Sequence, residues 1–409
     1  MDSSRRTLLQ GLGLGSLAGV WPFSSLAANQ RPARVYDQLG IRPLINFRGT
    51  HTSIGASKIW PDLHDVMADA SRDYVVLEEL QEKIGERLSR LTGSEAALVT
   101  TGAAGAICLG TCACLTGDDE RKIRRLPDLA GMKSEVIIQK PHRNGYDHAV
   151  RNTGVRIVEV ETREQLEQAV GPNTAMMYFL GGTSHDWTWE TPVPLEACLA
   201  VTRKAGIALM VDAANMLPPW DNIRKLAAQG VDLIAISGGK HMRGPQCSGI
   251  LAGRKDLIRA AWLNSSPHSD SLGRPMKVGR EEMIGAWQAV EKYARLDFDA
   301  LDRQSAQQAD YLIAQLARIP GLKAERTPFD RTRRVHRVLV QWDEKTTGLG
   351  TGEVERLLLE GEPRIAVLRA QAQGIEFTVF MNDAGDEKLA ARRMKEIFSN
   401  GRKSHENPK

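Results

Sequence analysis

The sequence predicts an α/β protein with a large, mainly parallel sheet, followed by a smaller α+β domain. Between about residues 96 and 251, short apolar runs rich in β-branched residues alternate with helix-length segments. Strands that alternate with helices form a parallel sheet covered on both faces. After about Trp287 the alternation ends and a long polar helical pattern begins. The last part of the chain therefore forms a separate, smaller unit.

The strand-like runs of the large sheet are residues 96–100, 136–139, 156–160, 175–180, 207–211 and 233–236. The helices that separate most of them are residues 106–115, 164–170, 195–205 and 223–229. Apolar residues at helical spacing predict another helix at residues 77–91. In the small domain we predict helices at residues 286–318, 352–359 and 386–398, and strands at residues 334–342, 364–368 and 374–381.

These patterns divide the 409-residue chain into four parts. They are a signal peptide at residues 1–28, an N-terminal arm at 29–71, the large domain at 72–285 and the small domain at 286–409. The arm is irregular and carries a polar cluster from Asn46 to Ser53. It lies on the surface or packs on a partner subunit, and its composition favours neither alternative.

The first residues have the three parts of a secretory signal in order. Arg5 and Arg6 precede a short run rich in glycine and leucine, and Ser25-Leu26-Ala27-Ala28 supplies small residues for cleavage. A twin arginine at this place is typical of the twin-arginine export route. The run is too short and too rich in glycine for a stable membrane span. We therefore predict a periplasmic protein that is exported in the folded state.

The composition argues against several classes of function. The formal net charge is +4, from 54 basic and 50 acidic residues, so the balance does not indicate a nucleic-acid partner. The five cysteines are odd in number and contain no CxxC pair, so neither a disulfide framework nor a zinc site is indicated. We therefore expect chemistry on a small molecule, without a metal.

Polar or glycine-rich clusters follow four of the predicted strands. In such sheets, ligands bind at the carboxyl ends of the strands. The four clusters are therefore expected to meet at one edge of the sheet and to form one site. They are Thr100-Thr101-Gly102, Pro141 to Gly145, Asp212 to Asn215, and Ser237-Gly238-Gly239-Lys240.

Lys240 is the candidate for covalent chemistry. It lies in a loop of small residues after a buried strand, where desolvation lowers the pKa of an amine so that it can attack a carbonyl. Taken alone, the loop is more simply a glycine-rich turn with a solvated lysine, since most lysines are exposed. Because Lys240 is expected to lie beside three other polar clusters, we prefer the covalent role to the solvated turn.

The other clusters offer complementary groups. Thr101-Gly102-Ala103 begins a helix whose N–H groups can hold an anion, although small residues there also suit tight packing. Asp212 ends an apolar strand, where a carboxylate needs a cationic partner unless it caps a turn. His142 follows another strand and either stacks on an aromatic ring or caps its loop.

The order of these groups along the chain resembles that in pyridoxal-phosphate enzymes with the type I, or aspartate-aminotransferase, fold. The sequence around Lys240, with Gly244-Pro245-Gln246 and Gly249, resembles the selenocysteine-synthase-like family. That family includes seryl-tRNA selenium transferase and D-glucosaminate-6-phosphate ammonia-lyase. Further similarity lies in Ile45-Asn46 with Gly49-Thr50, in Glu79-Leu80-Gln81, and in residues 125–127 and 142–148.

The resemblance implies pyridoxal 5′-phosphate as cofactor and a Schiff base, the internal aldimine, at Lys240. It further implies that Thr101, Gly102, Ala103 and Ser237 contact the phosphate, that Asp212 pairs with the pyridine nitrogen, and that Ala214 lies at the ring. His142 is preferred over His148 for stacking because of its position. We expect no tRNA substrate, because only a signal and a short arm precede the sheet domain and an exported protein does not meet charged tRNA.

We therefore predict a lyase that performs α,β-elimination on an amino acid or amino-sugar acid. The alternatives are a racemase, an aminotransferase or a selenium-transferase-like enzyme on the same scaffold, and a binding protein without turnover. Arg364 is the first candidate for the substrate carboxylate, because a guanidinium pairs with it bidentately. Arg243, or Arg48 and His51 from the arm, are the other candidates for substrate contacts. A homodimer or higher homo-oligomer is expected.

Overall fold

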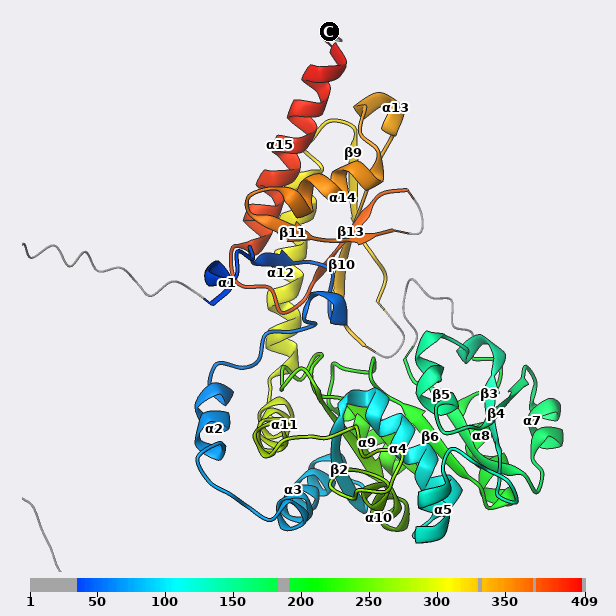
Figure 1. The fold of residues 1–409 in the computed structure, drawn as a ribbon. Coiled ribbons are helices and arrows are strands. Elements are labelled where there is room, and N and C mark those ends of the chain that lie inside the picture. Colours follow the sequence, from blue (N-terminus) through cyan, green and yellow to red (C-terminus); the bar gives the residue numbers. More distant parts are fainter. Residues whose placement is uncertain (1–34, 183–190, 330–332, 371–372, 407–409) are drawn as a thin grey trace, which may run out of the picture. The chain divides into compact units, whose positions relative to one another are not determined.

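The computed structural model describes residues 35–182, 191–329, 333–370 and 373–406 (Figure 1). The chain divides into two compact units, residues 1–43 and residues 44–409. The described part of the first unit contains the short helix α1 (Val35–Gln38). The predicted signal peptide lies outside the described residues. Within the described ranges, no helix combines the length and the apolar character needed to cross a membrane.

A seven-stranded sheet forms the centre of the large domain, with strand order β2-β8-β7-β6-β5-β3-β4. Within this sheet β8 pairs antiparallel with both of its neighbours, and the other pairs are parallel. The predicted, mainly parallel α/β sheet is therefore confirmed. The strands are β2 (Ala96–Thr101), β3 (Glu135–Gln139), β4 (Arg156–Val160), β5 (Thr174–Leu180), β6 (Ala208–Asp212), β7 (Leu233–Ser237) and β8 (Ser248–Gly253).

Two apolar layers cover the two faces of this sheet. All seven residues of β5 are buried, and neighbouring residues such as Met176 and Met177 belong to different layers. A strand buried on both faces explains why its sequence is a continuous apolar run. One layer includes α3 (Leu77–Thr92), α8 (Leu195–Ala205), α9 (Asp221–Ala228) and α11 (Arg280–Tyr293), and the other includes α4 (Gly102–Thr116) and α10 (Lys255–Leu263).

The small domain has its own sheet and its own core. Its four strands are antiparallel in the order β12-β13-β10-β9, and α12 and α15 pack against each other beside them (Figure 1). The strands are β9 (Leu322–Arg326), β10 (His336–Trp342), β12 (Leu368–Arg369) and β13 (Ile375–Val379). The helices are α12 (Phe298–Leu316), α13 (Glu344–Thr347), α14 (Thr351–Glu360) and α15 (Asp386–Glu406).

Part of the predicted arm belongs to the core of the small domain. Strand β1 (Leu44–Asn46) pairs with β11 (Arg364–Ala366), and the buried Phe47 packs edge-on against Phe377 at 5.4 Å. The arm also contains a helix, α2 (Leu63–Ala70). The description of residues 29–71 as irregular was therefore wrong for these segments. The reason is that β1 is stabilised by a strand more than 300 residues away, which a local pattern does not reveal.

Two further predictions of secondary structure were wrong. The single helix expected at residues 286–318 is two helices, α11 and α12, because the Asp297 carboxylate caps the second by accepting the Ala300 N–H at 2.9 Å. The strand expected at residues 364–368 is divided between β11 and β12, which belong to different sheets. The remaining short helices are α5 (Glu120–Arg125), α6 (His148–Arg151) and α7 (Arg163–Ala169).

Candidate active site

The four predicted clusters meet at one edge of the large sheet. Asp212, at the end of β6, pairs with Leu180 at the end of β5. On the other side of β6, Ser237 ends β7 and pairs with Gly249 of β8, which in turn pairs with Thr100 of β2. Because β8 is antiparallel, its amino end lies beside the carboxyl ends of its neighbours. The register of the sheet thus places the lysine loop between the Asp212 strand and the strand that leads into α4.

Lys240 is partly buried in the loop that follows β7. Burial lowers the pKa of its amine, and the positive charge of Arg333 lowers it further, whereas the negative charge of Asp212 raises it. The net effect is a pKa below the ordinary value of 10.5, which favours the neutral, nucleophilic form. The electrostatic effect of Asp212 on this amine also shows that the two groups share one site.

The glycines before Lys240 are required by packing inside the protein. A Cβ atom on Gly238 would lie 2.2 Å from Ser248 Oγ, and one on Gly239 would lie 2.4 Å from the Gln246 carbonyl oxygen. These glycines let the lysine loop fold tightly onto the segment that leads into β8.

Residues 57–60 of the predicted arm bind the lysine loop. Ser57 Oγ donates to the Gly239 carbonyl at 2.8 Å, and Trp60 Nε1 donates to the Met242 carbonyl at 2.7 Å. Arg243 lies over the Trp60 ring at 4.2 Å and donates from Nε to the Lys58 carbonyl. We call these contacts the arm clasp. Sequence reasoning did not find it, because its two halves are about 180 residues apart.

Asp212 is a buried carboxylate with two defined hydrogen-bond donors. Its side chain is only 5% exposed. Tyr178 Oη donates to Oδ2 at 2.8 Å, and the Ala214 N–H donates to Oδ1 at 3.0 Å. Burial and the Asp212 charge raise the pKa of Tyr178 well above its usual value, so the phenol keeps the proton that it donates. These bonds hold the carboxylate in one orientation at the end of β6.

His142 is 1% exposed and is fixed beside the end of β5. The Leu180 N–H donates to Nδ1 at 3.2 Å, Nε2 lies 3.4 Å from Thr191 Oγ1, and the ring meets Phe179 edge-on. Burial lowers its pKa to about 4, so the ring is neutral at pH 7. His148, the alternative considered from sequence, is exposed at the start of α6.

The segment Thr101-Gly102-Ala103 joins β2 to the N-terminus of α4. Gly102 has a φ of +67°, which favours glycine, and Thr100 Oγ1 donates to its carbonyl at 3.0 Å. A Cβ atom on Gly249 would lie 2.2 Å from the Gly102 carbonyl carbon, so β8 packs directly on this turn. The N–H groups of the first helical turn are thereby held near the end of β7 and can bind a phosphate.

The chemistry of these groups fits pyridoxal phosphate. The Lys240 amine, with its lowered pKa, suits an aldehyde, the Asp212 carboxylate suits a protonated pyridine nitrogen, and the N-terminus of α4 suits a phosphate. The flat ring of His142 suits contact with an aromatic ring. All four groups follow strands that end at the same edge of the sheet, namely β2, β3, β6 and β7.

The predicted substrate residues lie in different surroundings. Arg364 Nε donates to the Leu359 carbonyl at 2.8 Å, which directs this nitrogen to the backbone of α14. Arg48 directly follows Phe47, and His51 is exposed before the short helix η1 (Thr52–Ile54). Their roles, like that of Arg243, stay predictions.

Arg333 is a candidate that the sequence analysis missed. It is buried, and its Nη1 donates to Asn215 Oδ1 at 2.7 Å, within the cluster that begins at Asp212. Its positive charge also acts on Lys240. The arginine-rich stretch from Arg333 to Arg337 was visible in the sequence, but nothing local indicated which arginine reaches the large domain.

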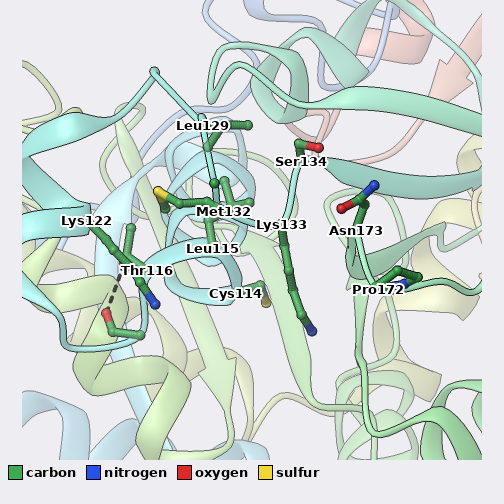
Figure 2. A pocket seen from close by; sticks show the side chains of 12 residues that line it. Cys114, Leu115, Thr116, Lys122, Leu129, Met132, Lys133, Ser134, Pro172 and Asn173 are labelled. Carbon is green, nitrogen blue, oxygen red and sulfur yellow. Dashed lines mark hydrogen bonds between the residues drawn. The ribbon is translucent and has the colours of Figure 1, made fainter.

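A cavity of about 800 Å³ lies at the opposite edge of the sheet (Figure 2). Its lining includes Ser134 and Asn173, which directly precede β3 and β5. It is therefore at the amino ends of the strands, away from Asp212 and Lys240. Figure 2 shows Lys122 and Lys133 on its wall. Because the candidate site lies at the carboxyl ends of the strands, this cavity is not part of it.

Comparison with known proteins places the chain among enzymes that use pyridoxal phosphate. The aminotransferase class-V family matches residues 146–345. The chain is 32% identical to 5′-C-glycyluridine monooxygenase-decarboxylase from a Streptomyces species, over 81% of this chain and 83% of the relative. It is 30% identical to D-glucosaminate-6-phosphate ammonia lyase from Salmonella typhimurium, over 89% of this chain and 97% of the relative.

Selenium transferases are more distant relatives. The chain is 27% identical to the L-seryl-tRNA(Sec) selenium transferase of Rhizobium meliloti and spans 56% of its length. Among solved structures, D-glucosaminate-6-phosphate ammonia-lyase superposes with a TM-score of 0.79 at 29% identity, covering 91% of this chain and 100% of that one. A NifS-like protein at 18% identity, covering 87% of this chain and 100% of its own, shares the fold with a TM-score of 0.58. The chain therefore belongs to the aminotransferase class-V family of pyridoxal-phosphate enzymes and has the type I fold predicted from its sequence.

Proposed function

We propose that this enzyme is a lyase that performs α,β-elimination on an amino acid with a hydroxylated, sugar-derived side chain. The observation that carries the proposal is that Lys240 and Asp212 follow adjacent strands at one edge of the sheet, with a lowered amine pKa and an oriented carboxylate. Two relatives support the substrate class. The names glycyluridine and glucosaminate both describe a molecule that joins an amine and a carboxylate to a sugar-derived part.

In an elimination, Lys240 would transfer the protons, and the other residues of the site would bind and orient the reacting groups. Bound pyridoxal phosphate supplies an electron sink that lowers the barrier to removing the proton next to the substrate amine. Lys240 Nζ, once neutral and free, takes this proton from the α-carbon. The electron pair of the broken C–H bond forms the double bond between the α- and β-carbons, while the β-hydroxyl leaves with its own pair. Lys240 returns the proton to the leaving hydroxyl, so water is released.

Asp212 and His142 would bind and orient the cofactor ring. Asp212, held by Tyr178 and the Ala214 N–H, would pair with the protonated ring nitrogen of bound pyridoxal phosphate and would keep that nitrogen charged. The neutral imidazole of His142 would offer the cofactor ring a flat contact without adding a competing positive charge. Addition of water to the released enamine then yields a keto acid and ammonia. The net reaction thus consumes one amino acid and produces one keto acid and one ammonia.

Arg333 is our candidate for the substrate carboxylate. It is buried, it contacts Asn215, and its charge acts on Lys240, so a carboxylate bound near Lys240 would meet the positive charge of Arg333. Arg364 and Arg243 remain the alternatives, with Arg48 and His51 from the arm.

Other reactions on the same scaffold are racemisation, transamination, selenium transfer and decarboxylation. Decarboxylation is the second candidate function, because the chain is 32% identical to a monooxygenase-decarboxylase. The two reactions differ in the bond that breaks at the α-carbon, so their products differ. Release of ammonia with a keto acid supports the lyase, and release of carbon dioxide supports the decarboxylase.

We further propose a homodimer that is exported by the twin-arginine route. Tyr74, Val75 and Val76 form an exposed apolar segment between α2 and α3, with Tyr74 96% exposed. A second copy of the chain that covers this segment would remove its apolar surface from water. Light scattering of the purified protein tests the dimer, and fractionation of cells that express residues 1–409 tests the export.

The direct test of the lyase is a screen of amino acids and amino-sugar acids for ammonia release by the enzyme loaded with pyridoxal phosphate. We expect release from substrates that carry a β-hydroxyl and none from their β-deoxy analogues, because the deoxy analogues have no leaving group. Equal turnover of both, or conversion to the mirror-image amino acid without ammonia, would overturn the elimination.

A further inference from the structure

A second cavity, of about 720 Å³, lies between the lysine loop and the small domain. His241 and Arg243 of the lysine loop form part of its wall, together with Trp60 of the arm clasp. Phe380 of the small domain lines it, and its ring contacts the His241 ring at 4.1 Å. Thr101, His142, Asp212 and Lys240 are not among its lining residues. The cavity therefore borders the candidate active site without containing Lys240 or Asp212, and it shares Arg243 with the residues considered for substrate contacts.

Two buried polar side chains on this wall have atoms without a hydrogen-bond partner among the described residues. His241 is 4% exposed and its Nδ1 makes no hydrogen bond. Tyr293, at the end of α11, is 2% exposed and its hydroxyl makes none. Buried polar atoms are nearly always paired in folded proteins. Two such atoms on the wall of one cavity indicate a ligand that supplies the missing partners.

The rest of the lining indicates the class of ligand. Phe298 and Phe380 present aromatic rings, which pack well against the C–H faces of a sugar ring, whereas the Trp60 ring is already in contact with Arg243 and Lys292. Five aspartates line the wall, together with Arg243 and Arg334. Asp302 is bonded to His336, and Asp383 forms an ion pair with Lys58, so three carboxylates have no cationic partner among the described residues. These three carboxylates attract an amine. The aspartates are Asp221, Asp297, Asp299, Asp302 and Asp383.

We propose that this cavity binds an amino sugar, a hydroxylated ring with a protonated amine and no acidic group. His241 and Tyr293 exchange hydrogen bonds with its hydroxyls, the aromatic rings hold its apolar face, and the aspartates pair with its amine. Because His241 adjoins Lys240, a bound amino sugar changes the contacts of the residue next to the reactive amine. The site is thus placed to regulate the enzyme, and it does not depend on which reaction Lys240 performs.

Calorimetric titration of the enzyme loaded with pyridoxal phosphate tests the proposal with glucosamine, glucose and gluconate. We expect glucosamine to bind in a one-to-one ratio, glucose to bind more weakly, and gluconate to give no signal. Tyr293→Phe removes one oxygen atom and is expected to weaken glucosamine binding about tenfold. Tyr146→Phe makes the same change at an exposed tyrosine outside the cavity and should leave the affinity unchanged.

Two further variants separate this site from the active site. His241→Phe keeps a ring against Phe380 but removes both nitrogens, and it should weaken binding at least as much as Tyr293→Phe. Lys240→Ala disables the candidate active site and should leave glucosamine binding intact. The proposal is overturned if the native enzyme binds no glucosamine, if neither cavity variant changes the affinity, or if Lys240→Ala alone abolishes binding.

Discussion

The two sides of the lysine loop differ in how their buried polar groups are satisfied. On the sheet side, both oxygens of Asp212 accept hydrogen bonds and His142 Nδ1 accepts one from Leu180. On the side of the small domain, His241 is nearly as buried as His142, yet its Nδ1 has no partner within the described ranges. Burial lowers the pKa of both histidines. The polar groups at the sheet edge are thus held in place by the protein itself, whereas His241 borders the cavity for which we propose a ligand.

The largest expected effect on the sheet side comes from Asp212→Asn. The amide keeps the shape and the Tyr178 contact but loses the charge that a protonated ring nitrogen needs, so we expect kcat to fall about a hundred- to a thousandfold. Tyr178→Phe should cost much less, because the Ala214 N–H still orients the carboxylate. Steady-state kinetics of both variants measure this, and equal losses would show that the Asp212 charge has no special role.

The buried His142 predicts a pH dependence of stability. Its pKa is about 4 in the folded protein and about 6.5 when unfolded, so the unfolded state takes up a proton first as the pH falls. The stability associated with the neutral ring is present above pH 6.5 and is lost as the pH falls towards 4. The loss amounts to about 3 kcal/mol.

Thermal unfolding of native protein and His142→Asn between pH 7 and 4 measures this contribution. The variant should lose less stability than the native protein on acidification. His148→Asn, at an exposed position, should follow the native curve. If His142→Asn and the native protein have parallel curves, the imidazole of His142 does not control acid stability.

The two arginine candidates can be compared directly. Arg333→Lys keeps the positive charge but loses the bidentate geometry, so we expect KM to rise about tenfold with a smaller change in kcat. Arg364→Lys, at the start of β11, should change neither constant, because its Nε is bonded to the Leu359 carbonyl. The opposite pattern would return Arg364 to the role predicted from sequence.

The smallest expected effect concerns the arm clasp. Trp60→Phe keeps an aromatic ring beneath Arg243 but removes the hydrogen bond to the Met242 carbonyl, which should cost about 1 kcal/mol of stability. Trp287→Phe removes a longer bond, at 3.3 Å to Glu291, in a half-buried position and should cost less. Calorimetry of both variants checks the order, and a larger loss in Trp287→Phe would contradict the importance of the clasp.

The sheet side was largely predictable because local patterns and one topological rule suffice there. Apolar runs located the strands, and the polar clusters of Asp212 and Lys240 had to meet because parallel strands end at one edge. Tyr178 was missed because its hydroxyl is hidden inside an apolar strand.

The other side depends on contacts between distant segments. Ser57 and Trp60 bind a loop about 180 residues away, and Arg333 reaches Asn215 across 118 residues. No periodicity in the sequence reports such contacts. For the same reason Phe47, in a segment that looked irregular, is part of the small-domain core.

Identification of the residue that binds pyridoxal phosphate tests the central claim most directly. The loaded enzyme should absorb visible light, and borohydride should abolish this absorbance and fix the cofactor to the protein. Peptide mass spectrometry should then find the pyridoxyl group on Lys240, and Lys240→Ala should lose it while Lys58→Ala, beside the same loop, retains it. A colourless protein that binds no cofactor, or a pyridoxyl group on another lysine, would contradict the account.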